Sequence, residues 1–170
     1  MSDAAAMDYL PIFLRLEQRP VAVVGGGAIA LRKVSTLRAA GAHITVIAPH
    51  LDPQLAAEVA RGELRHVAAP FTAAHLGNAV VVIAATDDAD VNRAISQAAQ
   101  ERGLPVNVVD DAELSTFIFP AIIDRSPILV AVSWRVVLRF SLVAYARRSR
   151  RSCRHALVRW RASWGSGAAH

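Results

Sequence analysis

Continuous apolar runs alternate, over the first two thirds of the chain, with segments in which apolar residues recur at helical spacing. Pro20–Val24 is apolar throughout and leads into three consecutive glycines, after which residues 28–40 carry apolar side chains every three or four positions. An unbroken apolar run is typical of a strand buried on both faces, and the 3.6-residue spacing is typical of a helix. The chain therefore begins with a predicted strand, a glycine turn and a helix that ends at Gly41.

The same alternation continues as far as Asp110. Further strands are predicted at residues 44–48, 64–68, 80–85 and 106–109, and further helices at 53–61 and 88–102. Because strands 20–24 and 80–85 are continuously apolar instead of alternating, we expect a parallel sheet covered on both faces, and right-handed crossovers then give an α/β, Rossmann-type doubly wound fold. Beyond Asp110, apolar runs at 117–123 and 128–132 flank a turn signal and predict a β-hairpin appended to the sheet.

The glycine turn carries the clearest chemical signal. Gly25, Gly27 and Ala30 have the spacing of the G-x-G-x-x-A dinucleotide fingerprint. The first glycine allows a sharp turn, the second lets a pyrophosphate approach the backbone, and the small third residue packs the helix on the strand. The helix start offers unpaired N–H groups and a partial positive charge. We therefore expect cofactor contacts at Gly25, Gly26 and Gly27.

One expected element of such a site is missing. The acid that binds the ribose hydroxyls of NAD commonly stands at the end of the second strand, about 20 residues after the fingerprint. Here that place reads Ala48-Pro49-His50, and Asp52 lies further around the turn. Since a histidine suits either a hydroxyl or a phosphate, the residues alone leave NAD and NADP undecided.

Composition and charge narrow the function classes. The 170 residues suffice for one good core, and 54% hydrophobic with 6% aromatic residues indicates an aliphatic interior. Residues 1–133 hold all 14 acids and a net charge of −4, whereas residues 134–170 hold nine Arg, no acid and a charge of +9. The main body is thus mildly acidic, so the overall charge of +5 does not make nucleic acid its expected partner.

Metal-binding and targeting signals are weak. Cys153 is the single cysteine, and the six histidines show no ligand spacing, so we expect no resident metal site. Residues 1–8 contain no Lys or Arg, and no apolar run reaches the length that spans a membrane. We therefore expect a cytoplasmic protein without a membrane partner.

Several strings together are similar to the N-terminal module of siroheme synthases, the precorrin-2 dehydrogenase and sirohydrochlorin ferrochelatase module. They are LPIF at 10–13, VGGGAIA at 24–30 followed by Arg32-Lys33, AATDD at 84–88 with Asn92, NVVD at 107–110, and FIFPAIIDRSP at 117–127. The resemblance implies NAD-dependent oxidation of precorrin-2 to sirohydrochlorin in siroheme biosynthesis. Many members of that family also act as a lyase that inserts ferrous iron, as a substrate, into sirohydrochlorin, and the family is homodimeric.

The resemblance also implies roles for particular residues. Matched position by position, the dinucleotide contacts fall on Ala28 and Ile29 and on Pro49 and His50, and the catalytic carboxylate falls on Asp110. A carboxylate just past a strand end is placed to accept the proton that accompanies hydride loss. The alternative is that Asp110 or its neighbour only caps a turn.

The resemblance stops after Ser133, and the composition changes at the same point. Residues 134–170 contain all three Trp and the single Cys. We assign 1–133 to an NAD-binding, precorrin-2 dehydrogenase-like domain and 134–170 to an Arg-rich tail, which we hypothesise to be a frameshifted remnant of the dimerisation region. This hypothesis puts the homodimer and the activity of the chain in question.

Other functions stay open at this stage. The tail alone also fits a nucleic-acid-binding segment or a helix on a membrane surface. For the whole chain, the alternatives to the enzyme are a non-catalytic Rossmann nucleotide-binding or regulatory domain and an inactive truncated product.

Overall fold

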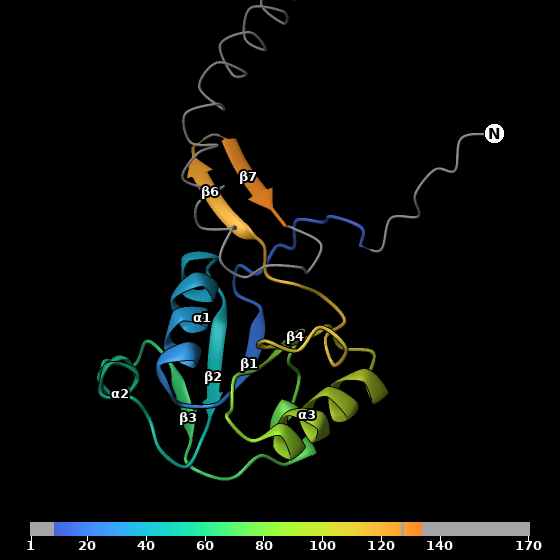
Figure 1. Cartoon of the computed structure of the whole chain (residues 1–170). Coiled ribbons are helices and arrows are strands. Elements are labelled where there is room, and N and C mark those ends of the chain that lie inside the picture. The colour runs from blue at the N-terminus through green and yellow to red at the C-terminus, as the bar shows by residue number, and fades with distance from the viewer. Residues whose placement is uncertain (1–8, 127, 134–170) are drawn as a thin grey trace, which may run out of the picture. The chain divides into compact units, whose positions relative to one another are not determined.

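The computed structural model describes residues 9–126 and 128–133, and the chain divides between Ile118 and Phe119 into two compact units. The first unit contains a five-stranded sheet with its helices, and the second contains a two-stranded sheet (Figure 1). The tail predicted at 134–170, and with it the frameshift hypothesis, lies outside the described residues.

The first unit alternates strands and helices as the apolar pattern predicts. Its elements are β1 Pro20–Val24, α1 Ala28–Ala39, β2 His43–Ile47, α2 Pro53–Ala60, β3 Arg65–Val67, the 3₁₀ helix η1 Ala73–Leu76, β4 Val81–Ala84, α3 Ala89–Glu101 and β5 Val106–Val108. The five strands are parallel in the order β3-β2-β1-β4-β5. This is the Rossmann-type arrangement, so the predicted fold class is confirmed.

The strand order reverses direction at β1, which pairs with β2 on one side and β4 on the other. Right-handed crossovers in opposite directions place α1 and α2 on one face of the sheet and α3 on the other, as Figure 1 shows. In open α/β sheets, ligands bind at the carboxyl edge where the order reverses. The fold therefore points to the ends of β1 and β4 as the place for a site.

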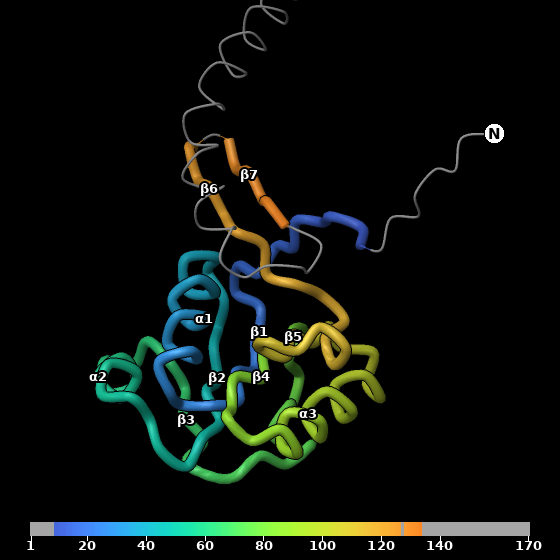
Figure 2. Tube along the Cα trace, in the orientation of Figure 1, coloured from blue at the N-terminus to red at the C-terminus, as the bar shows by residue number. Residues whose placement is uncertain are grey.

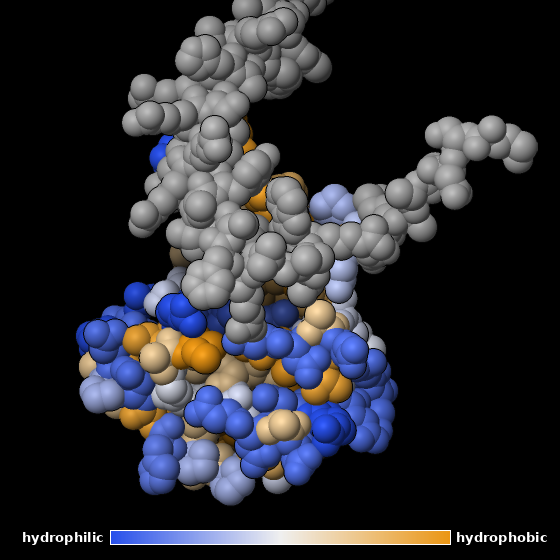
Figure 3. Space-filling view, viewed as in Figure 1, coloured by the Kyte–Doolittle hydropathy of each residue, from blue (hydrophilic) through white to orange (hydrophobic). Residues whose placement is uncertain are grey.

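The core is aliphatic and centred on the sheet. All four residues of β4 are buried, and α1 buries Ala30, Val34 and Leu37, which recur at helical spacing on its inner side. The face shown in Figure 3 carries mostly hydrophilic residues with apolar patches between them. Burial of the apolar face of each helix against a sheet whose central strands β1 and β4 are apolar throughout explains why most strand and helix positions were readable from the sequence.

The outer edge of β5 is closed by the chain segment that follows it (Figure 2). The amide of Val106 donates to the hydroxyl of Thr116 at 2.8 Å, and the amide of Val108 donates to the hydroxyl of Ser115 at 2.9 Å. The buried side chain of Asn107 donates to the carbonyl of Phe117. Two hydroxyl side chains thus replace the neighbouring strand that an open edge would otherwise recruit.

These hydrogen bonds at the edge of β5 shift the start of the predicted hairpin. Its first strand, β6, spans Ala121–Arg125 instead of 117–123, because Thr116 and Phe117 already bond to Val106. β6 pairs antiparallel with β7, Ile128–Val132, in a sheet of their own. The predicted hairpin is confirmed, and it forms a two-stranded sheet separate from the five-stranded one. The short η1 was not predicted either, since four residues show no periodicity.

The closure of β5 can be tested with Thr116→Val, which keeps the shape of the side chain and removes its hydroxyl. We expect the free energy of unfolding to fall by about 1–3 kcal/mol, because the amide of the fully buried Val106 loses its acceptor. Urea denaturation measures the change. Thr36→Val, which removes an exposed hydroxyl bonded within α1, is the control and should leave stability nearly unchanged. Equal effects of the two substitutions would contradict this account.

Candidate functional site

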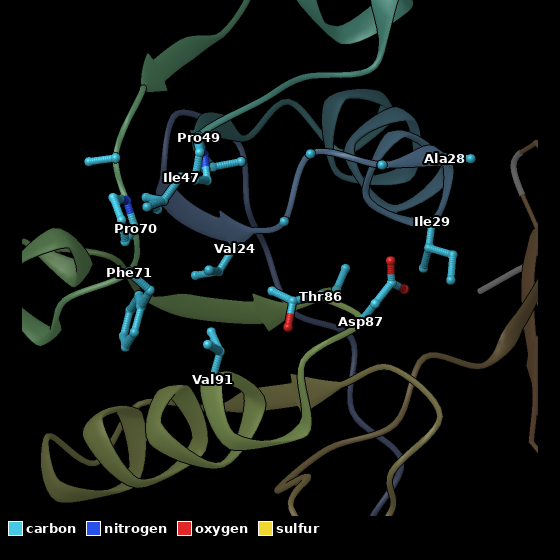
Figure 4. A pocket seen from close by; sticks show the side chains of 16 residues that line it. Val24, Ala28, Ile29, Ile47, Pro49, Pro70, Phe71, Thr86, Asp87 and Val91 are labelled. Atoms are coloured by element: carbon cyan, nitrogen blue, oxygen red, sulfur yellow. The ribbon is translucent and has the colours of Figure 1, made fainter.

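A cavity of about 540 Å³ opens at the carboxyl edge of the sheet where β1 and β4 end (Figure 4). It is lined by residues 24–29, 47–49, 69–71, 85–87 and 91. Most of these are small or apolar, and Asp87 is the one charged residue among them. The size and largely apolar lining are typical of small-molecule sites.

The glycine turn forms one wall, and two of its glycines are required by their neighbours. A Cβ built on Gly25, whose φ is +119°, would lie 2.2 Å from the carbonyl oxygen of Ala85. A Cβ on Gly26 would lie 2.0 Å from the carbonyl oxygen of His50. A Cβ on Gly27 would meet no atom within 4 Å. Gly25 and Gly26 therefore permit close packing, whereas Gly27 leaves its backbone open to a bound molecule.

The start of α1 differs from the starts of the other two described α-helices. Asp52 caps α2 by accepting from the amide of Gln54 at 2.8 Å, and Asp88 caps α3 by accepting from the amides of Asp90 and Val91. The cap of α1 is Gly27, with no side-chain hydrogen bond and no acid in the first turn. The first amides of α1 thus have no side-chain acceptor, at the cavity wall. Such a bare helix start suits an anionic group.

The predicted contact residues of this wall lie together. Gly25, Gly26, Gly27, Ala28 and Ile29 all line the cavity. Figure 4 shows Ala28 and Ile29 at the beginning of α1, on the same side of the cavity as Asp87. The residues present therefore fit a dinucleotide: a backbone free of side chains next to unpaired amides.

The turn between β2 and α2 forms the adjoining wall. Pro49 lines the cavity, whereas His50 is exposed and is not among the lining residues. The carbonyl of His50 faces Gly26, and the amide of Asp52 donates to the carbonyl of Gly26 at 2.6 Å. This turn is therefore held against the glycine turn by backbone contacts. This contact was not predicted, because neither Gly26 nor His50 belongs to a local pattern that indicates it.

The structure distinguishes Asp110 from its neighbour Asp111. The carboxylate of Asp111 accepts from the amides of Glu113 and Leu114 at 3.0 Å each, so Asp111 caps the turn after β5. Asp110 is exposed and has a φ of +70°, in the left-handed region that favours glycine and asparagine. Such backbone strain in a residue other than glycine is most common at functional positions.

Asp110 also interacts electrostatically with Lys33 on α1. Burial lowers the pKa of the half-buried Lys33, the charge of Arg32 lowers it further, and the charge of Asp110 raises it in opposition. Lys33 and Asp110 lie outside the set of residues that line the cavity. Their electrostatic interaction nevertheless places a carboxylate and an ammonium within reach of each other, next to the helix that begins at the glycine turn.

Two further features of the described residues concern metals and membranes. Within residues 9–126 and 128–133, no three His, Cys, Asp or Glu side chains are grouped so that they could hold a metal ion. Over the same residues, the helices are too short or too polar for a membrane span.

Comparison with known proteins adds to this geometry. The chain is 61% identical over 127 residues to the siroheme synthase of Methylobacillus flagellatus, covering 75% of this chain and 27% of that protein. It is 55% identical to siroheme synthase 2 of Aeromonas salmonicida, covering 75% of this chain and 26% of that protein. The chain thus spans about a quarter of the length of these curated relatives.

A solved structure agrees with these relatives. SirC, a precorrin-2 dehydrogenase, superposes with a TM-score of 0.75 at 26% identity, over 85% of this chain and 71% of that one. The predicted resemblance to siroheme synthases is confirmed by these matches. The pattern of the family described as "Putative NAD(P)-binding" matches residues 12–121, around the whole glycine turn and cavity. The chain therefore belongs to this NAD(P)-binding family.

Proposed function

We propose that this chain is an NAD-dependent oxidoreductase that oxidises precorrin-2 to sirohydrochlorin in the cytoplasm. The observation that carries the proposal is the start of α1, which has no side-chain cap and opens with Gly27 onto the cavity. The starts of α2 and α3 are instead capped by aspartates. The choice of substrate is supported by the names of the relatives, a siroheme synthase at 61% identity and a precorrin-2 dehydrogenase of the same fold.

The chain's own residues suit the binding of the dinucleotide. The amides that follow Gly27, at Ala28 and Ile29, provide donors for the pyrophosphate. Pro49 and His50 would flank the adenosine, and Phe71, which is half-buried at the cavity wall, offers an aromatic face. When bound, NAD supplies the hydride acceptor for the oxidation.

Asp110 is the proposed general base. Removal of a hydride from the tetrapyrrole requires the loss of a proton, and the exposed carboxylate of Asp110 stands just beyond the carboxyl end of β5. The carboxylate of Asp111 is already bonded to two backbone amides, whereas that of Asp110 interacts with Lys33. The strained turn thus presents one acid of the pair and uses the other to hold its shape.

The nucleotide contact is tested by Gly27→Ala. Because the new methyl group meets no protein atom within 4 Å, the fold should be retained, and the affinity for NAD should fall about tenfold or more as the methyl group occupies the phosphate approach. Isothermal titration with NAD measures the affinity, and thermal unfolding checks the fold. Gly26→Ala is the contrasting variant: its methyl group collides with the His50 carbonyl, so its stability should fall. Unchanged NAD affinity in Gly27→Ala would overturn the assignment.

The role of Asp110 is tested by two substitutions that both remove the carboxylate but differ in their effect on the backbone. Asp110→Asn keeps a residue that tolerates a φ of +70°, and Asp110→Gly removes the strain and should stabilise the fold by about 1 kcal/mol. Both lack the carboxylate, so both should lose turnover by about a hundredfold or more while NAD affinity is retained. Formation of NADH from precorrin-2 measures turnover.

Asp111→Asn is the matched control for this experiment. Its side-chain oxygen can still accept from the amides of Glu113 and Leu114, so stability and turnover should both be nearly unchanged. Retained turnover in Asp110→Asn would refute the base assignment. NAD binding by the unmodified chain without any turnover would favour the alternative of a non-catalytic nucleotide-binding domain.

A further inference from the structure

We infer that Pro49 and Asp52, on the β2–α2 turn, make this site selective for NAD by limiting the backbone donors near the 2′-phosphate of NADP and by placing a negative charge beside it. The inference rests on the proposed binding of a dinucleotide and adds the basis of its selectivity. It answers the question that the missing ribose acid raises: how a turn without that acid can discriminate between the two dinucleotides.

The two dinucleotides differ at one place. NADP carries a phosphate on the adenosine ribose where NAD carries a hydroxyl, and in Rossmann folds that ribose lies against the turn after the second strand. A phosphate is held by Arg or Lys side chains and by backbone amides. Binding of the 2′-phosphate therefore depends on the donors that are available in the turn at residues 48–54.

Four of the six backbone positions from 49 to 54 cannot donate to a phosphate. Pro49 and Pro53 have no amide hydrogen. The amide of Asp52 donates to the carbonyl of Gly26 at 2.6 Å, and the amide of Gln54 donates to the carboxylate of Asp52 at 2.8 Å. Among these six positions, the turn therefore leaves only the amides of His50 and Leu51 as backbone donors for a phosphate.

The charge of the turn acts in the same direction. The carboxylate of Asp52 sits on the start of α2 and offsets the partial positive charge there. Lys and Arg are absent from the lining residues, whose one charged member is the acid Asp87. A doubly charged 2′-phosphate at this turn would thus approach the carboxylate of Asp52 and find no Lys or Arg in the lining, whereas the neutral hydroxyl of NAD would not be repelled.

Asp52 consequently disfavours NADP, as the missing ribose acid would, but without binding the ribose hydroxyls. A ribose acid at the end of β2 would accept hydrogen bonds from the sugar hydroxyls. Ala48, which stands near that place, is buried and carries no hydrogen-bonding side chain. Asp52 keeps its carboxylate on the Gln54 amide and acts on the 2′-phosphate through charge alone.

The test is a pair of dissociation constants, for NAD and for NADP, measured by isothermal titration on the full chain. The unmodified chain should prefer NAD. Asp52→Ser retains a helix cap and removes the charge, so NADP affinity should rise about three- to tenfold while NAD affinity is unchanged. Adding Pro49→Arg to Asp52→Ser should raise NADP affinity further, since it supplies a cation. The preference of the unmodified chain should also weaken as salt is raised.

Asp88→Ser is the matched control, because it makes the same change at the cap of α3. It should leave the ratio of the two dissociation constants unchanged. Asp52→Asn repeats the charge removal with a second good capping residue, should the serine variant fold poorly.

Each result decides the inference. Equal affinity of the unmodified chain for the two dinucleotides, or an unchanged ratio in Asp52→Ser and Asp52→Asn, would overturn it and leave the proposed function standing. Failure of the unmodified chain to bind either dinucleotide would overturn both. An equal rise in NADP affinity in Asp88→Ser would show a general charge effect and would also overturn the role of this turn.

Discussion

The site depends on one close approach of three backbone segments. The glycine turn after β1 lies between the carbonyl of Ala85, at the end of β4, and the carbonyl of His50, in the turn after β2, with no space for a Cβ at Gly25 or Gly26. Parallel pairing of β1 with both β2 and β4 brings these three strand ends to one edge. Since the glycines allow the segments to touch, α1 begins at a fixed place with its amides toward the cavity.

The helix caps explain why an anion is favoured at the start of α1 and disfavoured at the start of α2. Two α-helices of the first unit begin with an aspartate whose carboxylate accepts backbone amides, and α1 begins with a glycine that accepts none through a side chain. A capped start is already neutralised by its own acid, whereas an uncapped start retains the partial positive charge of the helix. The arrangement therefore favours a phosphate at α1 and disfavours one at α2, which is the physical link between the proposed function and the proposed selectivity.

Adjacent aspartates after β5 illustrate how a turn can hold a functional group. Asp111 and the hydroxyl side chains of Ser115 and Thr116 satisfy backbone groups of the turn and of the edge of β5. Those contacts over-determine the backbone, so Asp110 can be held at a φ of +70° that costs about 1 kcal/mol in a residue other than glycine. The stability of the turn and the exposure of Asp110 are thus two results of the same set of hydrogen bonds.

Much of the fold was predictable because its signals are local. Apolar runs marked the parallel strands, most clearly β1 and β4, helical spacing marked α1, α2 and α3, and the glycine spacing marked the turn. Element ends were less predictable: the hairpin begins at Ala121 because Thr116 bonds to Val106, a contact between residues ten positions apart.

The amino-acid sequence by itself determined the Rossmann-type fold class, the location of the glycine turn and the family resemblance, since each depends on residue types at short spacing. Only the tertiary structure decided that Gly26 is required by the carbonyl of His50, that Asp111 caps the turn, and that Asp110 interacts electrostatically with Lys33. These relations join segments far apart in the chain, and they arise from strand pairing and backbone hydrogen bonds that no local pattern of side chains encodes.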